Sequence, residues 1–144
     1  MSATVLLVDD DAVLLQLMSA GFAAAGFRVF TADNGRKGVR MAETCAPDLV
    51  VTDIVMPELE GIGLIRAIKQ SPRAPKVIAI SGAARGRGRD YLSWARHLGA
   101  DETLAKPFRM SELLRVAATL IEDQTQSQSQ TVNDLEGCRA HSTR

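Results

Sequence analysis

The sequence lacks several features that would place a protein in a specialised class. Its two cysteines, Cys45 and Cys138, lie 93 positions apart in 144 residues, so a disulfide scaffold is not expected and a reducing cytoplasm is favoured. Its 17 basic and 17 acidic residues cancel, so no net charge drives binding to nucleic acid or to an anionic membrane. No apolar run approaches the roughly 20 residues that span a bilayer. The first residues carry no basic segment typical of a secretion signal. We therefore expect a cytoplasmic protein that binds neither membrane nor nucleic acid directly.

The remaining composition is that of one globular domain with a polar end. Apolar residues make up 46% and charged residues 24% of the sequence, and a chain of this length is ordinarily one domain. Residues 124–131 are all Gln, Ser or Thr, and such a run cannot bury a core. We expect a folded domain over residues 1–121 and a disordered tail over residues 122–144. The tail leaves no room for an output module, so a single-domain protein is expected.

Short apolar runs alternate with stretches of helical periodicity along the folded part. The expected strands are five runs: 5–8, 27–31, 49–51, 76–80 and 102–105. The expected helices are 12–25, 35–45 after an Asn34 cap, 60–70, 91–98, and a last helix capped by Ser111. Apolar strands that are each followed by an amphipathic helix indicate a parallel sheet covered on both faces. The sequence thus predicts a doubly wound α/β fold, with strand order 2-1-3-4-5 or the nucleotide-fold order beginning 3-2-1.

Polar residues follow four of these strands, at the edge where parallel sheets form their sites. They are Asp9 and Asp10 after the first strand, Asp53 after the third, Ser81 after the fourth and Lys106 after the fifth. Three neighbouring carboxylates repel one another unless a cation lies among them, and their oxygens suit Mg²⁺. A metal, a hydroxyl and a lysine together can bind a phosphoryl group, with a carboxylate as the nucleophile.

The segments around these residues resemble the receiver domain of two-component response regulators. The matching segments are VLLVDDD at 5–11, PDLVVTDIVMP at 47–57, ISGA at 80–83, and 98–108 with its Lys-Pro-Phe end. The resemblance covers about residues 3–121. It implies a flavodoxin-like fold with the strand order 2-1-3-4-5. It also implies a single-domain receiver that stands alone, similar to the chemotaxis regulators.

The resemblance also implies a role for each site residue. Asp53 would accept a phosphoryl group from a histidine kinase or a histidine phosphotransfer protein. Ser81 and Lys106 would bind the phosphoryl oxygens, and the Lys106–Pro107 peptide bond would be cis, which is cheap only before proline. The ligands of Mg²⁺ (or Mn²⁺) would be carboxylate and backbone carbonyl oxygens: those of Asp9, Asp10, Asp53 and Val55.

One position departs from the family pattern. The switch aromatic of receivers, three residues before the lysine, is Thr103 in this chain, which puts the standard coupling to the moving hydroxyl in doubt. The resemblance implies a switch rather than an enzyme with substrate turnover. A downstream protein target would read the face of the fourth helix, fifth strand and fifth helix, and the protein would be a monomer or a phosphorylation-dependent dimer.

Two other functions stay open. Asp9-x-Asp11-x-Val13 after an apolar strand resembles the opening motif of the haloacid dehalogenase family, in which Asp9 would be the nucleophile of a Mg²⁺-dependent phosphatase and Asp11 its acid/base. Against that function, the chain lacks a substrate cap and a late acidic pair, and Asp53 would be unexplained. The other alternative is a receiver-like module that binds partners without being phosphorylated, although all five expected site positions are filled.

Overall fold

The computed structural model describes residues 2–54, 60–82, 93 and 95–122, with residues 60 and 61 described in their backbone alone. Five parallel strands form one sheet in the order β2-β1-β3-β4-β5. The strands are β1 (Thr4–Val8), β2 (Arg28–Ala32), β3 (Leu49–Asp53), β4 (Lys76–Gly82) and β5 (Glu102–Lys106). This order confirms the flavodoxin-like alternative and not the nucleotide-fold one.

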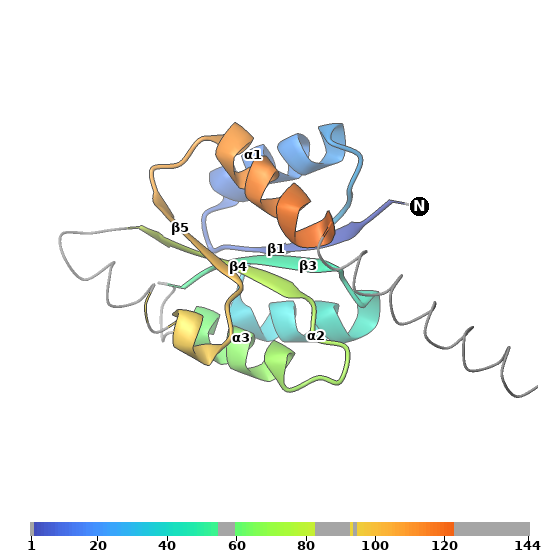
Figure 1. The fold of residues 1–144 in the computed structure, drawn as a ribbon, viewed down its shortest axis with the longest axis vertical. Helices are drawn as coiled ribbons and strands as arrows, with labels where there is room; N and C mark the ends of the chain where they lie inside the picture. The colour runs from blue at the N-terminus through green and yellow to red at the C-terminus, as the bar shows by residue number, and fades with distance from the viewer. Residues whose placement is uncertain (1, 55–59, 83–92, 94, 123–144) are drawn as a thin grey trace, which may run out of the picture.

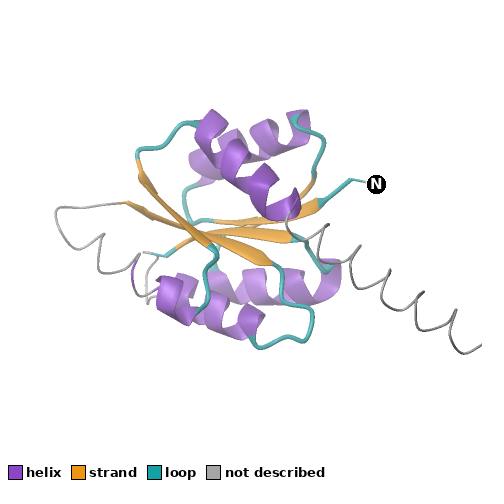
Figure 2. Ribbon diagram, viewed as in Figure 1, coloured by secondary structure: helices purple, strands orange, loops and turns teal. Residues whose placement is uncertain are grey.

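Helices cover both faces of the sheet (Figures 1 and 2). The helices are α1 (Ala12–Ala24), α2 (Gly35–Cys45) and α3 (Glu60–Lys69), with further helical residues at 93, 95–98 and 110–122. α1 and residues 110–122 lie on one face, while α2, α3 and residues 95–98 lie on the other. Among the described residues, no helix is long and apolar enough to cross a bilayer.

The two layers of helices explain why the strands are apolar throughout. In β1, Leu6 and Val8 pack under α2 and α3, whereas Val5 and Leu7 pack under α1 and the 110–122 helix. All four side chains are fully buried. Because successive side chains point to opposite faces, a strand covered on both sides needs apolar residues at every position. The expectation of a doubly covered sheet is thus confirmed.

Helix ends follow the expected capping chemistry with one exception. Asn34 accepts a hydrogen bond from the Lys37 N–H at 2.9 Å and caps α2, as predicted.

Ser111 was expected to cap the last helix, but that prediction is wrong. The Arg109 carbonyl already accepts hydrogen bonds from the N–H groups of Glu112 and Leu113, at 3.0 and 3.1 Å. The helix therefore begins at Met110, whose side chain packs against the core, and Ser111 lies in the first turn.

The Asp101 carboxylate ties the entrance of β5 to its neighbours, and its loss is expected to weaken the fold. One oxygen accepts from the Val77 N–H and from Lys69 Nζ, each at 2.8 Å. Asp101→Ala would leave the Val77 N–H unpaired and Lys69 Nζ with only the Pro75 carbonyl, so we expect the free energy of unfolding in urea titration to fall by about 2 kcal/mol. Asp33→Ala is the control, because its ion pair with Lys37 is exposed and should contribute under about 0.5 kcal/mol. Equal losses in the two variants would contradict this role for Asp101.

Candidate functional site

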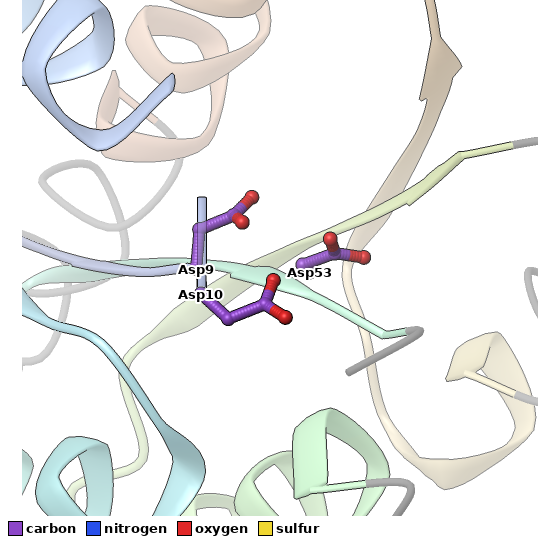
Figure 3. A group of neighbouring side chains, drawn as sticks. All are labelled: Asp9, Asp10 and Asp53. Carbon is purple, nitrogen blue, oxygen red and sulfur yellow. The ribbon is translucent and has the colours of Figure 1, made fainter. Parts of the chain in front are cut away.

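Three aspartates meet at the carboxyl edge of the sheet (Figure 3). Asp9 and Asp10 follow β1, and Asp53 ends the neighbouring strand β3. One carboxylate oxygen of each lies within 4.8 Å of the others. Asp9 and Asp53 are only 1% and 5% exposed, whereas Asp10 is exposed. The cluster therefore has a buried floor and an open side, as a metal site reached from solvent requires.

The sheet itself holds the aspartates at one level. Val8 is the register partner of Thr52, so the residues that follow them in sequence, Asp9 and Asp53, come side by side. The Asp9 N–H also donates to the Ala32 carbonyl at 3.2 Å, which extends the β1–β2 pairing by one residue. The Asp9 and Asp53 carboxylates are thus attached to hydrogen-bonded backbone, which fixes their positions before any ligand binds.

Within the described part of the chain, Lys106 supplies positive charge to the cluster. Its Nζ lies 3.0 Å from Asp53 Oδ2 and 3.5 Å from Asp9 Oδ2, and its side chain is 27% exposed. The Lys106–Pro107 peptide bond is cis, as the resemblance implied. One ammonium facing two buried carboxylates, with Asp10 beside them, leaves the cluster with an excess of negative charge that a divalent cation would balance.

Burial and charge shift the protonation of two site groups. Burial, with a smaller effect of the Asp53 charge, raises the pKa of Asp9 from 3.8 to about 6, against the hydrogen bond from the Asp11 N–H, which lowers it. For Lys106, burial acts to lower the pKa, but the hydrogen bond and charge of Asp53, with the smaller effect of Asp9, raise it above its usual value. The lysine therefore stays charged, and the ionised Asp9 is costly without a second cation.

Ser81 contributes a buried hydroxyl. It is fully buried in β4, next to the strand that carries Asp53. Its Oγ has no hydrogen-bond partner within the described part of the chain. Buried hydroxyls are nearly always paired, and an unpaired one at a site edge is suited to bind an oxygen of a ligand. Together with the carboxylates and the ammonium, this group fits a metal ion and a phosphoryl group.

Asp11 has a different place from the one the phosphatase alternative requires. Its Oδ1 accepts from the N–H groups of Val13 and Leu14 at 3.0 and 3.2 Å, so Asp11 is the N-cap of α1. Its own N–H donates to Asp9 Oδ1 at 2.8 Å. Asp11 thus fixes the start of the helix and orients a buried carboxylate. An aspartate directly before a helix is the usual signal of a cap, so this role of Asp11 could have been predicted from its position, whereas only an acid/base role was predicted for it.

The structure brings together most of the predicted site. Asp9, Asp10, Asp53 and Lys106 converge, and Ser81 lies in the adjacent strand. Thr103 lies in β5 opposite Ala79, three residues before the lysine, and is half-buried. Val55, the expected carbonyl ligand, and the expected tail beyond residue 122 lie outside the described residues.

Comparisons with known proteins agree with this geometry. Residues 5–118 match the family model described as "Response regulator receiver domain". Transcriptional regulatory protein PrrA of Mycobacterium leprae is 38% identical over 120 residues, which are 83% of this chain and 50% of that protein. KDP operon transcriptional regulatory protein KdpE of Escherichia coli is 34% identical over 116 residues, 78% of this chain and 50% of that protein. The chain thus spans about half the length of these curated relatives.

Solved structures resemble the fold over nearly their whole length. A CheY-like response regulator receiver domain protein from Methanospirillum hungatei has a TM-score of 0.78 at 26% identity, covering 88% of this chain and 99% of that one. The signal receiver domain of a response regulator from Bermanella marisrubri has a TM-score of 0.76 at 29% identity, covering 84% and 99%. With the family model matching most of the sequence, the chain belongs to the response regulator receiver domain family.

Proposed function

We propose that Asp53 accepts a phosphoryl group from the phosphohistidine of a histidine kinase or a histidine phosphotransfer protein. The observation that carries the proposal is the contact between the Asp53 carboxylate and Lys106 Nζ, at 3.0 Å, inside a cluster of three carboxylates. A lone strand-end aspartate has many explanations. A buried one that faces an ammonium and two further carboxylates is equipped for phosphoryl transfer.

Asp9, Asp10 and Asp53 would hold Mg²⁺ or Mn²⁺, with the Val55 carbonyl as a further ligand. The donor set supports this, because hard divalent cations prefer oxygen ligands and Mg²⁺ keeps several waters beside one or two carboxylates. When bound, the ion would supply positive charge to the phosphoryl oxygens.

In the transfer, a carboxylate oxygen of Asp53 attacks phosphorus as the phosphorus–nitrogen bond to the donor histidine breaks. The electron pair of that bond stays on the histidine, whose ring nitrogen becomes neutral or takes a proton from solvent. Lys106 Nζ balances charge on the transferred group, and the Ser81 hydroxyl donates to one of its oxygens. That donation would give the buried Ser81 hydroxyl, which has no hydrogen-bond partner within the described residues, a partner when the phosphoryl group is bound.

The proposed output is a change in partner binding in the cytoplasm, where kinases that use ATP supply the phosphoryl group. A downstream protein would read the surface formed by the fourth helix, β5 and the 110–122 helix, on the protein as a monomer or phosphorylation-dependent dimer. Thr103 stands where receivers place an aromatic switch, so we expect this surface to respond without an aromatic rotation. The single-domain organisation, with a tail over residues 122–144, stays a prediction.

The test is labelling by a small acyl phosphate, followed by intact mass. We expect wild type with Mg²⁺ to gain one phosphoryl group, and to gain none when EDTA removes the metal. Asp11→Ser is the discriminating variant, because serine preserves a helix cap but is no acid/base. In a receiver it should be labelled at close to the wild-type rate, and in a phosphatase with Asp9 as nucleophile it should lose activity. Absence of labelling from acyl phosphate and from phosphohistidine donors would favour the non-phosphorylated binding module.

A further inference from the structure

Thr52 is a buried polar residue that the proposed mechanism does not use. Among the described residues, the polar or charged side chains that are buried are Asp9, Thr52, Asp53 and Ser81. All of these except Thr52 belong to the functional site. Thr52 is 0% exposed and directly precedes Asp53 in β3. A buried hydroxyl costs free energy unless it is hydrogen-bonded, so the partner of this hydroxyl indicates what it does.

Packing alone does not require a hydroxyl at this position. Thr52 is the register partner of Val8 in β1 and of Ala79 in β4, and both neighbours are fully buried apolar residues. Valine has nearly the same shape as threonine and would fill this row of the sheet without a polar atom, as Val50 does two residues earlier on the same face. The hydroxyl is therefore explained by the hydrogen bond that it makes, and not by the space that it fills.

The Thr52 hydroxyl binds the backbone of Asp53. Its Oγ1 donates to the Asp53 carbonyl oxygen at 3.0 Å. That carbonyl and the Ile54 N–H belong to one planar peptide unit, and the Ile54 N–H donates to the Ile80 carbonyl at 2.8 Å. The peptide unit is thus held at both ends, by a side chain of β3 and by the backbone of β4. These two hydrogen bonds, which we call the Asp53 clamp, lie at the point where β3 ends.

The Asp53 clamp fixes the direction of the Asp53 side chain (Figure 3). That direction is set by the two peptide units that flank the residue. The preceding unit lies in the sheet, where Thr52 is in register with Val8 and Asp53 with Ile80, and the clamp holds the following unit. Lys106 Nζ, 3.0 Å from Asp53 Oδ2, does not fix the carboxylate alone, because a lysine side chain is a flexible point charge.

We propose that Thr52 is a positioning residue for phosphoryl transfer, and that its hydroxyl holds the backbone of Asp53 so that the carboxylate is aimed at phosphorus. Successive side chains of a strand point to opposite faces, so Thr52 acts through the Asp53 backbone and does not contact the transferred group. The inference rests on the proposed function of Asp53. Because attack requires a defined geometry, loss of the Thr52 hydrogen bond is expected to slow the transfer by about three- to tenfold.

The test compares Thr52→Val, which keeps the shape and removes the hydroxyl, with Thr52→Ser, which keeps the hydroxyl and removes a methyl group. Labelling by acyl phosphate at saturating Mg²⁺ should be about three- to tenfold slower in Thr52→Val and within about twofold of wild type in Thr52→Ser. In urea titration the order should reverse. Thr52→Ser should have the lower midpoint, because it loses a buried methyl group, and Thr52→Val should stay closer to wild type. A merely structural role would make the labelling rate follow stability.

Hydrogen exchange of the Ile54 amide, measured by NMR on the unphosphorylated protein, tests the clamp without the reaction. Thr52→Val should exchange this amide at least about threefold faster than wild type, and Thr52→Ser should stay close to wild type. Thr44→Val is the matched control. Thr44 Oγ1 also donates to a backbone carbonyl, that of Arg40 at 2.9 Å, but on the exposed side of α2. This variant should label as wild type does and leave the exchange of the Ile54 amide unchanged.

Labelling of Thr52→Val at the wild-type rate would overturn the proposal, even with faster exchange at Ile54, because the clamp would then not aim the carboxylate. Equal slowing in Thr52→Ser or in Thr44→Val would overturn it as well, since the loss would not follow this hydroxyl. With wild type labelled, unchanged exchange of the Ile54 amide in Thr52→Val would refute the clamp alone. A wild type without label would instead refute the proposed function, and with it the reaction that Thr52 would serve.

Discussion

Asp9→Asn is expected to stabilise the metal-free protein at pH 7.5 and to abolish its stabilisation by Mg²⁺. Burial raises the pKa of Asp9 to about 6, above its ordinary value of 3.8. The folded state therefore binds the proton more tightly than the unfolded state does. Stability from this group is present below about pH 4, is lost as the pH rises toward 6, and stays lost above it. A shift of about two units corresponds to about 3 kcal/mol at pH 7.5.

Asparagine removes this cost while it keeps the local geometry. Its amide oxygen can still accept from the Asp11 N–H, which lies 2.8 Å from Asp9 Oδ1 in the structure. We expect the free energy of unfolding in urea and EDTA to rise by about 2–3 kcal/mol at pH 7.5, and by less at pH 5, where wild-type Asp9 is largely protonated. Added Mg²⁺ should stabilise wild type through binding to the native state, and should not stabilise the variant.

Asp10→Asn is the matched control. Asp10 is exposed, so its replacement relieves no burial and should leave metal-free stability within about 0.5 kcal/mol. It should nevertheless weaken the response to Mg²⁺, because one ligand is lost. A loss of stability of Asp9→Asn in EDTA would contradict the assignment of Asp9 as a buried, costly carboxylate.

Lys106→Met, in contrast to Asp9→Asn, is expected to destabilise the metal-free protein, and it should slow phosphorylation strongly. Lys106 Nζ faces Asp53 and Asp9 at 3.0 and 3.5 Å, and methionine of similar length leaves both carboxylates without their ammonium. Loss of one partner of a buried pair costs up to 3–5 kcal/mol. Since about a quarter of this lysine side chain is exposed, we expect about 1–3 kcal/mol in urea titration, after a discount for solvent screening.

Mg²⁺ should restore much of that loss, because it supplies charge to the same carboxylates. The rate of labelling by acyl phosphate should fall by about 100-fold, since one cation aimed at the transferred group is worth about 3 kcal/mol of barrier. Lys76→Met is the control, because Lys76 lies 3.9 Å from Asp101 in a partly exposed pair at the other end of β4. Labelling of Lys106→Met at the wild-type rate would remove the lysine from the site.

The elements of the fold could be predicted from the sequence because burial on both faces leaves a local signal. Runs such as Leu49–Val51 are apolar at every position, which only a doubly covered strand requires. The strand order left no such signal. It depends on which strands pair across the sheet, as Val8 pairs with Thr52, and the apolar pattern is the same in either order.

The convergence of the site was predictable for a similar reason. Parallel strands end at one edge, so Asp9, Asp53 and Lys106 were expected at the same edge once the sheet was parallel, and the strand order then decides how close together they lie. The differences in burial among the site residues were not predictable. Adjacent aspartates in the sequence are buried at position 9 and exposed at position 10, because the first extends the ladder to Ala32 and the chain then turns away from the sheet. Whether the Ser81 hydroxyl finds a hydrogen-bond partner, which it does not among the described residues, likewise depends on side chains from other strands.

If Asp53 is the phosphoacceptor, the phosphoryl group must lie on its side chain, and the position of the label can be read directly. Protein phosphorylated by acyl phosphate and Mg²⁺ is treated with borohydride, which reduces an aspartyl phosphate to homoserine, and its peptides are sequenced by mass spectrometry. We predict homoserine at position 53 and unreduced aspartate at positions 9 and 10. Homoserine at position 9, with Asp53 intact, would contradict the assignment of Asp53 as the phosphoacceptor and favour the phosphatase with Asp9 as its nucleophile.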